Sequence, residues 1–198
     1  MQKEEKYFQM SLTVDVVLFT IEQGELKVLF IKRNNEPFKG LYSLPGGFVH
    51  EKETTKEAAK RILAEKVGVK NVYIEQLYTF DNLNRDPRGQ IFSVTYFAMA
   101  TREEIVWEQN TLNQEPEFIS VKELPKLAFD HSEIVKYSIK RLQAKLEYTN
   151  VVYSLLPKEF TLNQLQSTYE IILDKKLDKR NFQKKYLQLG LITPTKKM

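Results

Sequence analysis

Hydrophobic residues near the start of the chain gather in two neighbouring runs. Residues 11–33 are rich in β-branched and aromatic side chains on either side of Gln23-Gly24, and this pattern predicts a β-hairpin that turns at the glycine. Residues 34–47 contain two prolines and three glycines, which predicts a loop.

The hydrophobic period then becomes that of a helix. In residues 54–67, alanine, isoleucine, leucine and valine recur at intervals of three and four, and Gly68 ends the pattern. Strands are predicted at 72–80 and 90–100, with the polar residues 81–89 as a loop between them.

A short strand with a turn at 117–125 and a helix at 130–147 complete this part of the chain. Asp130 or Ser132 is in position to act as the N-cap of the helix. Together the elements predict an α/β fold in which a mixed sheet carries helices on its faces.

After Tyr148 no strand-rich stretch follows, and the pattern is helical. Residues 160–176 carry an apolar stripe and begin with Thr161 and Gln164 at the spacing of a capping box. A second helix is predicted at 177–190. It begins after the N-cap Asp178, ends at Gly190, and is expected to turn three apolar residues to the core: Phe182, Tyr186 and Leu189.

The connection between these two helices is short, so they must pack as a compact corner, which is the geometry of a helix-turn-helix. Residues 191–198 add a short extended piece and a basic end, enough for the stub of a wing. The sequence therefore predicts two domains, residues 1–150 and residues 151–198.

Charge separates the same two parts of the chain. Residues 1–150 contain 21 Lys and Arg against 22 Asp and Glu, whereas residues 151–198 contain 9 against 4. The whole excess of positive charge therefore lies in the last quarter. A basic terminal module on a neutral body is typical of a polyanion-binding protein, and the alternative is a solvated lysine-rich tail.

Composition excludes several classes of protein. The 198-residue chain is 42% hydrophobic and 28% charged, as soluble globular proteins are. No apolar run approaches the ~18 residues of a membrane span, and the first residues show no apolar core of a signal peptide. The absence of cysteine excludes disulfides and thiolate metal sites. We therefore expect a cytoplasmic protein without a membrane partner.

Residues 46–69 carry the most specific motif of the first domain. Gly47, Glu53, Arg61, Glu65 and Gly68 occur in the order and spacing of the Nudix box, and the stretch resembles that of Nudix proteins. The resemblance implies an α/β/α sandwich with a mixed sheet. It also implies a cleft that recognises a nucleoside diphosphate linked to another group.

Departures from the box bear on catalysis. The resemblance implies that Nudix hydrolases bind Mg²⁺ or Mn²⁺ through glutamates on one face of the helix, where this chain has Ile62, Glu65 and Lys66. A hard divalent cation prefers several oxygen ligands, and Lys66 puts a positive charge where the metal would lie. We therefore expect no metal, no cofactor and no catalytic residue, and hence no hydrolysis.

The same cleft is expected to bind a ligand. Lys66, with Arg33 or Arg88, is predicted to supply the positive charge that a metal would give to a diphosphate. The alternative is that Lys66 only forms an ion pair with Glu53 or Glu65. The candidate effector-binding residues are Arg33, Phe38, Glu53, Arg61, Glu65, Lys66, Asp86 and Arg88. By contrast, His131 is expected to serve a helix cap or the core.

Five further stretches extend the resemblance over nearly the whole chain. They are RDPRG at 85–89, LAFDH at 127–131, KLEYT at 145–149, LLPKEFTLNQLQ at 155–166 and LDKRNF at 177–182. With the altered Nudix box, they resemble the NrtR family of Nudix-related transcriptional regulators of NAD metabolism. This implies a homodimeric repressor that binds a double-stranded DNA operator and releases it on binding ADP-ribose or a related NAD metabolite. Some relatives respond to a sugar, so a sugar effector stays open.

The second C-terminal helix is expected to be the recognition helix, because its N-terminal end and outer side are polar and basic. Arg180 and Asn181 are suited to base contacts and the surrounding lysines to phosphate contacts. The candidate DNA-binding residues are Lys175, Lys176, Lys179, Arg180, Asn181, Gln183, Lys184, Lys185, Lys196 and Lys197. A solvated helix face is the alternative for this surface.

Two other functions stay open. One is hydrolysis of ADP-ribose or another nucleoside diphosphate derivative with a relocated metal site, which release of AMP would reveal. The other is a protein-interaction module, which the basic C-terminal part of the chain disfavours.

Overall fold

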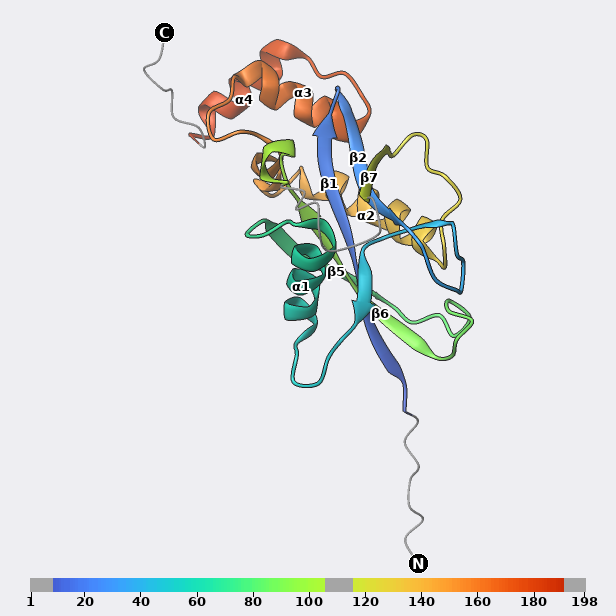
Figure 1. Cartoon of the computed structure of the whole chain (residues 1–198). Helices are drawn as coiled ribbons and strands as arrows, with labels where there is room; N and C mark the ends of the chain where they lie inside the picture. Colours follow the sequence, from blue (N-terminus) through green and yellow to red (C-terminus); the bar gives the residue numbers. More distant parts are fainter. Residues whose placement is uncertain (1–8, 106–115, 191–198) are drawn as a thin grey trace, which may run out of the picture.

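The computed structural model describes residues 9–105 and 116–190, and a mixed sheet forms its centre (Figure 1). The strands are β1 (Ser11–Glu22), β2 (Glu25–Lys32), β3 (Tyr42–Ser43), β4 (Gly46–Phe48), β5 (Tyr73–Phe80), β6 (Ile91–Met99) and β7 (Pro116–Ser120). Their order is β3-β2-β1-β6-β5, with β4 paired to β1 and β7 paired to β2. β1 and β6 run parallel and the other pairs antiparallel, which confirms the predicted mixed sheet.

Helices cover both faces of the sheet. Helix α1 (Thr55–Val67) belongs to the core that contains Val14 and Val16 of β1, and α2 (His131–Lys145) to the core that contains Val17. Successive residues of a strand point to opposite faces, so β1 contributes to both cores. The predicted α/β/α sandwich is confirmed.

Local sequence determines where α1 begins and ends. The Thr54 hydroxyl accepts a hydrogen bond from the Glu57 backbone N–H, and the Glu57 carboxylate accepts one from the Thr54 N–H. This reciprocal capping box satisfies two donors at the helix start. Gly68 ends the helix at φ 69°, a left-handed conformation that glycine adopts without steric cost.

Two helices after the sheet, α3 (Leu162–Leu173) and α4 (Lys179–Gln188), share the core on the α2 side. Phe182 of α4 lies buried in that core. The side-chain amide of Gln143 in α2 also donates a 2.9 Å hydrogen bond to the carbonyl oxygen of Ile172 in α3. The C-terminal helices therefore pack directly on the Nudix-like part of the chain, as the upper part of Figure 1 shows.

Four expectations from the sequence need correction. The predicted loop at 34–47 contains β3, which pairs with the end of β2, and the start of β4, which pairs with β1. A 3₁₀ helix (Val151–Leu155) forms where no element is predicted. Leu189 follows the end of α4 and is 51% exposed, so it does not face the core. Asp130 is the N-cap of α2, one of the two expected positions, but it makes no capping hydrogen bond because its carboxylate is bound to Arg85.

Candidate functional site

A cavity of about 250 Å³ opens beside the first half of β1. Its lining comes from β1, β2, β3, β4, α1, the first residue of α2, the loop between β5 and β6, and the loops next to β2, β3 and α2. Four basic side chains and two carboxylates contribute to it: Arg33, Lys66, Arg85, Arg88, Asp15 and Asp86. An excess of positive charge in a recess favours an anionic ligand.

The floor of the cavity is polar because the side chains on one face of β1 change from polar to apolar along the strand. Thr13 and Asp15 occupy the cavity end of this face, and Val17 continues it into the apolar core. In parallel register with them, β6 places the buried Ser93 beside Thr13 and the buried Thr95 beside Asp15. These four polar side chains form a hydrophilic patch on the sheet next to the apolar core.

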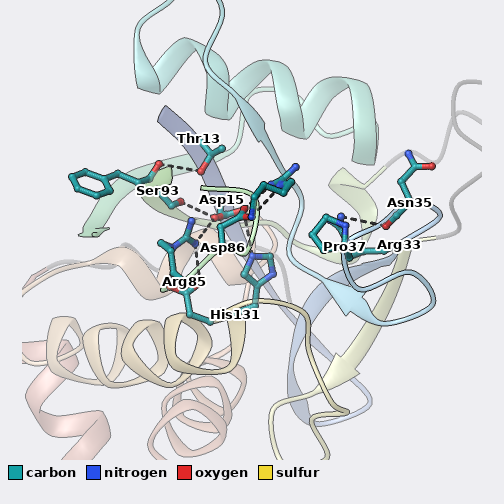
Figure 2. A network of polar contacts seen from close by, with 12 residues as sticks. Thr13, Asp15, Arg33, Asn35, Pro37, Arg85, Asp86, Ser93 and His131 are labelled. Atoms are coloured by element: carbon teal, nitrogen blue, oxygen red, sulfur yellow. Dashed lines mark hydrogen bonds and ion pairs between the residues drawn. The ribbon is translucent and has the colours of Figure 1, made fainter. Parts of the chain in front are cut away.

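Arg85 connects Asp15 on the cavity floor to Asp130 at the start of α2 (Figure 2). Its guanidinium donates two 2.8 Å hydrogen bonds to the carboxylate of Asp130 and one of 3.3 Å to Asp15. Asp15 also accepts a 2.7 Å hydrogen bond from the Ser93 hydroxyl. Burial opposes the charge of Arg85, whose side chain is 3% exposed, but the two carboxylates raise its pKa above the usual value. Arg85 is therefore a fixed, buried cation.

His131, the first residue of α2, is a second buried contact to Asp15. The Leu44 backbone N–H donates a 2.9 Å hydrogen bond to His131 Nδ1, so the proton of the neutral ring lies on Nε2. Nε2 is 3.6 Å from the Asp15 carboxylate. Burial lowers the pKa of His131, which keeps the ring neutral near pH 7. His131 thus serves packing and positioning, in line with the expectation from sequence.

The side chain of Lys66 extends from α1 into the cavity. Its ammonium donates a hydrogen bond to the carbonyl oxygen of Gly46. A Cβ atom at Gly46 would overlap the Asp15 carboxylate, so only glycine fits there. Burial lowers the pKa of Lys66, an effect that the charge of Asp15 opposes. The alternative reading of Lys66, an ion pair with Glu53 or Glu65, does not hold, because both carboxylates are bound to Arg61.

Aromatic rings and guanidinium groups alternate at the rim of the cavity. Phe129 adopts a left-handed backbone conformation (φ 53°), which is uncommon for a bulky residue and occurs where the surroundings enforce it. Its ring centroid lies 4.7 Å from the guanidinium carbon of Arg33 and 5.5 Å from that of Arg88. Arg88 in turn lies 5.4 Å from the ring of Phe48, and the buried Asp86 holds it with two hydrogen bonds.

The structure brings together four of the eight candidate effector-binding residues: Arg33, Lys66, Asp86 and Arg88 line the cavity. Phe38 does not line it, and packs edge-on against Phe129 at a centroid distance of 4.9 Å. The other three, Glu53, Arg61 and Glu65, also lie outside the lining. Their roles in binding stay predictions.

An ion-pair cluster accounts for the positions of those three residues. Both Glu53 oxygens accept hydrogen bonds from Arg61, at 2.7 and 2.8 Å, and Glu65 accepts a longer one. The Arg61 hydrogen bonds, with one from the His50 N–H, lower the pKa of Glu53 to about 2. Arg61 also donates to the carbonyl oxygen of Phe48, so the cluster fastens β4 to α1. These surviving box residues therefore maintain the frame of the site.

Most of the lining residues are not among the sequence candidates for binding, and the charged and aromatic ones among them are Asp15, Phe48, Arg85, Phe129 and His131. Asp15 carries a visible signal, because a lone carboxylate interrupts the apolar run from Val14 to Phe19. Arg85 lies within the RDPRG stretch, yet its burial cannot be read from a loop sequence. The two phenylalanines carry no local signal.

The second candidate surface lies on α4. Its N-cap Asp178 accepts a hydrogen bond from the Asn181 N–H, and Lys179, Arg180 and Asn181 are exposed in the first turn. Cations near a helix N-terminus are unfavourable for the helix dipole. An approaching phosphate would relieve that repulsion and gain the attraction of both charges.

The other candidate DNA-binding residues differ in their surroundings. Lys175, Lys184 and Lys185 are exposed, whereas Gln183 is half-buried and lies 3.4 Å from the side-chain oxygen of Asn163. Lys176 is exposed and paired with Glu170. Lys196, Lys197 and the expected wing at 191–198 lie outside the described residues.

Comparison with known proteins shows which families the two parts of the chain resemble. The model of the NUDIX domain matches residues 11–138, and the model of the NrtR DNA-binding winged helix domain matches residues 152–198. The ADPR responsive transcriptional repressor NtrR of Acinetobacter baylyi is 37% identical over 189 residues, which cover 93% of this chain and 75% of that protein. The chain belongs to the NrtR family.

Solved structures of Shewanella oneidensis NrtR support the membership. One matches with a TM-score of 0.84 and 36% identity over 93% of this chain and 87% of that one. NrtR complexed with a 27mer DNA matches at 0.80 and 35% over 94% and 89%. The NUDIX domain of the same NrtR complexed with ADP ribose matches at 0.61 and 37% over 71% and 94%.

A hydrolase is also similar to this NrtR-family chain. The ADP-ribose pyrophosphatase of Methanocaldococcus jannaschii is 36% identical over 135 residues, or 68% of this chain and 79% of that enzyme.

Among the helices of residues 9–105 and 116–190, none is long and apolar enough to cross a membrane.

Proposed function

We propose that this chain is a DNA-binding transcriptional repressor that senses ADP-ribose in the cavity of its Nudix domain and does not hydrolyse it. Residues 1–150 form the effector-binding domain, residues 151–198 form the DNA-binding domain, and the protein acts as a homodimer in the cytoplasm. The observation that carries the proposal is the ammonium of Lys66, which occupies the cavity from a position where the Nudix box has a carboxylate.

The remaining box positions do not suit a divalent metal. Ile62 is fully buried in the core under α1, and Glu65 is bound to Arg61. In the described part of the chain, no group of three or more His, Cys, Asp and Glu side chains could hold a metal ion. Diphosphate hydrolysis in the family relies on a metal to polarise the attacking water, and these residues do not supply its ligands.

Charge in the cavity suits a diphosphate without metal. Lys66, Arg33 and Arg88 reach the same recess from three different segments of the chain. One planar guanidinium group can donate hydrogen bonds to two phosphate oxygens at once, and an ammonium group acts as a compact positive charge. The neighbouring carboxylate of Asp86 is already bound by Arg88, which limits its repulsion of an anion.

A calorimetric titration with ADP-ribose in excess EDTA tests the proposal. We expect saturable binding without metal, and a lower affinity for the DNA upstream of the gene in a gel shift when ADP-ribose is added. In parallel, incubation of ADP-ribose with Mg²⁺ or Mn²⁺ is expected to release no AMP. Absence of binding in EDTA would overturn the sensor, and release of AMP would favour the hydrolase.

Replacing Lys66 with methionine is expected to weaken ADP-ribose binding in EDTA by about 30- to 100-fold. Loss of a desolvated charge that pairs with a ligand charge costs about 2–3 kcal/mol, and each 1.4 kcal/mol is tenfold. Lys56→Met is the matched control, because Lys56 is an exposed lysine of the same helix. Calorimetry that gives both variants the affinity of the wild type would remove Lys66 from the site.

The position of α2 supports a route from the cavity to the DNA-binding domain. Its first residue, His131, lines the cavity, and Asp130 just before it is bound by Arg85. The helix has 15 residues and so spans roughly 22 Å, at about 1.5 Å per residue. Near its other end Gln143 is hydrogen-bonded to Ile172 of α3. A ligand that shifts Arg85 would thus bias the placement of α3 and α4.

Gln143→Ala is expected to reduce this coupling while leaving each binding reaction intact. We expect the ratio of operator affinities without and with ADP-ribose to fall about fivefold, the lower end of typical coupling energies. Gel shifts with and without ADP-ribose measure the ratio, and Lys140→Ala on the exposed side of α2 is the control. An unchanged ratio in the Gln143 variant would exclude this route.

A further inference from the structure

An exposed aromatic cluster lies where the edge of the sheet meets α2. The rings of Tyr78 and Phe80 from β5 and of Tyr137 from α2 contact one another, with centroid distances of 5.4, 5.3 and 6.0 Å. β5 is the last strand of the sheet on this side, so no other described strand pairs with its outer edge. Tyr78 is 51% exposed and Tyr137 is 40% exposed. Two large aromatic side chains therefore lie next to each other at an open edge.

A β-bulge in β5 directs Tyr78 to this position. The register with β6 shifts between Gln76 and Tyr78, so Leu77 is an extra residue in the strand. Successive side chains of a regular strand point to opposite faces. Here the buried Leu77 and its neighbour Tyr78 both lie on the α2 side, Leu77 in the core and Tyr78 against Tyr137. The bulge thus fills the core and presents an aromatic ring to the outside at the same point.

The row of α2 that contains Tyr137 also carries opposite charges. Glu133 lies four residues before Tyr137 and Arg141 four residues after it, and all three side chains are exposed. At 3.6 residues per turn, the two charged residues lie about 40° to either side of Tyr137 on the helix surface. The row therefore has an acidic end, an aromatic centre and a basic end. Such a row is complementary to a copy of itself that runs in the opposite direction.

Twofold symmetry produces this antiparallel arrangement. In an isologous dimer the same patch of both protomers meets around the axis, so that residue i contacts residue j while j contacts i. With the axis near Tyr137, Glu133 of each copy would face Arg141 of the other. Rows of residues four apart lie alongside each other in the commonest class of helix packing. The tyrosines would form the centre of the contact and the charges its rim, which is the usual anatomy of a protein interface.

We infer that Tyr78, Tyr137, Glu133 and Arg141 belong to the surface through which two copies of this chain associate. The inference rests on the proposed function, which includes a homodimer, and names the interface of that dimer. Operator binding depends on this surface, because two half-sites need two recognition helices held in one dimer. ADP-ribose binding does not depend on it, since none of the four residues lines the cavity.

Charge reversal in the full-length protein tests the interface by analytical ultracentrifugation. Glu133→Arg alone or Arg141→Glu alone puts like charges opposite each other twice, and we expect the dissociation constant of either dimer to rise about tenfold or more. An equimolar mixture of the two variants is expected to regain dimers of wild-type strength, because both pairs in the mixed dimer are again opposite in charge. Lys56→Glu is the control, since Lys56 is an exposed residue of α1 on the other face of the sheet.

Replacing both Tyr78 and Tyr137 with alanine removes the aromatic centre. We expect the dissociation constant of the dimer to rise roughly 100-fold or more, which is about 2.8 kcal/mol at 1.4 kcal/mol per tenfold, because aromatic residues at interface centres are frequent hot spots and each is present twice. Operator affinity should fall with dimerisation, whereas ADP-ribose affinity in excess EDTA should stay within about twofold. Thermal unfolding reports whether each variant is folded.

The outcomes separate this interface from the proposed function. Dimers that persist in all the variants, or a mixture that does not associate, would overturn the interface and leave the sensor and the homodimer intact. Variants that remain dimeric but bind the operator less tightly would assign this face to DNA and also overturn it. A monomeric wild type would overturn the homodimer together with its interface, while ADP-ribose binding would still test the sensor.

Discussion

Replacing Arg85 with methionine should destabilise the protein by about 3–5 kcal/mol. The substitution leaves the carboxylates of Asp15 and Asp130 without the cation that binds both of them, and removal of one partner from a buried ion pair has this cost. Urea unfolding monitored by circular dichroism measures the difference. The expected loss is a large fraction of the 5–15 kcal/mol by which domains are usually stable.

Two further variants separate the effect of ion pairing from that of packing. Arg102→Met breaks a half-exposed contact with Glu22 and is expected to cost less than about 1 kcal/mol. Adding Asp130→Asn to Arg85→Met removes one unpaired charge and should recover part of the stability. If the double variant is no more stable than Arg85→Met, the network is not held together by charge.

Replacing both Lys179 and Arg180 with alanine should weaken operator binding by roughly 100-fold or more. A bidentate base contact contributes about 1–3 kcal/mol, and a phosphate contact adds an electrostatic share that depends on salt. The slope of log affinity against log salt should fall by about 0.9 for each phosphate that the variant no longer neutralises. Gel shifts over a series of salt concentrations measure both effects.

Lys158→Ala is the control for this variant, because Lys158 is an exposed lysine of the same domain outside α4. The double substitution should not unfold α4, since Asp178 still caps it and two cations leave the positive end of its dipole. Operator binding that survives the substitution would show that α4 is not the recognition helix.

The two surfaces differ in how far local sequence reveals them. The basic residues of α4 are neighbours along one helix, so the helical period and the N-cap together place them on the outer side. In the cavity, the same period places Lys66 on α1 but gives no indication that its ammonium binds the carbonyl oxygen of Gly46, or that the Asp15 carboxylate fills the space next to that glycine. A glycine in a motif indicates that a neighbouring group needs the space of a side chain, but only the fold shows which group that is.

For the two remaining glutamates of the Nudix box, the sequence suggests a place in the ligand cavity that the structure does not give them. Glu53 and Glu65 lie at the family spacing and are therefore natural candidates for ligand contact. In the structure Arg61 binds both, and all three residues lie outside the cavity lining. Spacing along a helix determines which side chains share a face. The partners of that face are set by a strand and a loop that approach it from elsewhere.

Sequence by itself determined the Nudix and winged-helix architecture, the end of α1 at Gly68, and the N-caps of α3 and α4. These properties depend on residues close together in the chain, where helix period and capping act. Only the tertiary structure decided that Asp15, Arg85 and Asp130 form one buried network and that Phe48 lies open at its rim. Arg85 lies 70 residues from Asp15 and 45 from Asp130. Strand pairing and burial bring such groups together, and no local pattern encodes those contacts.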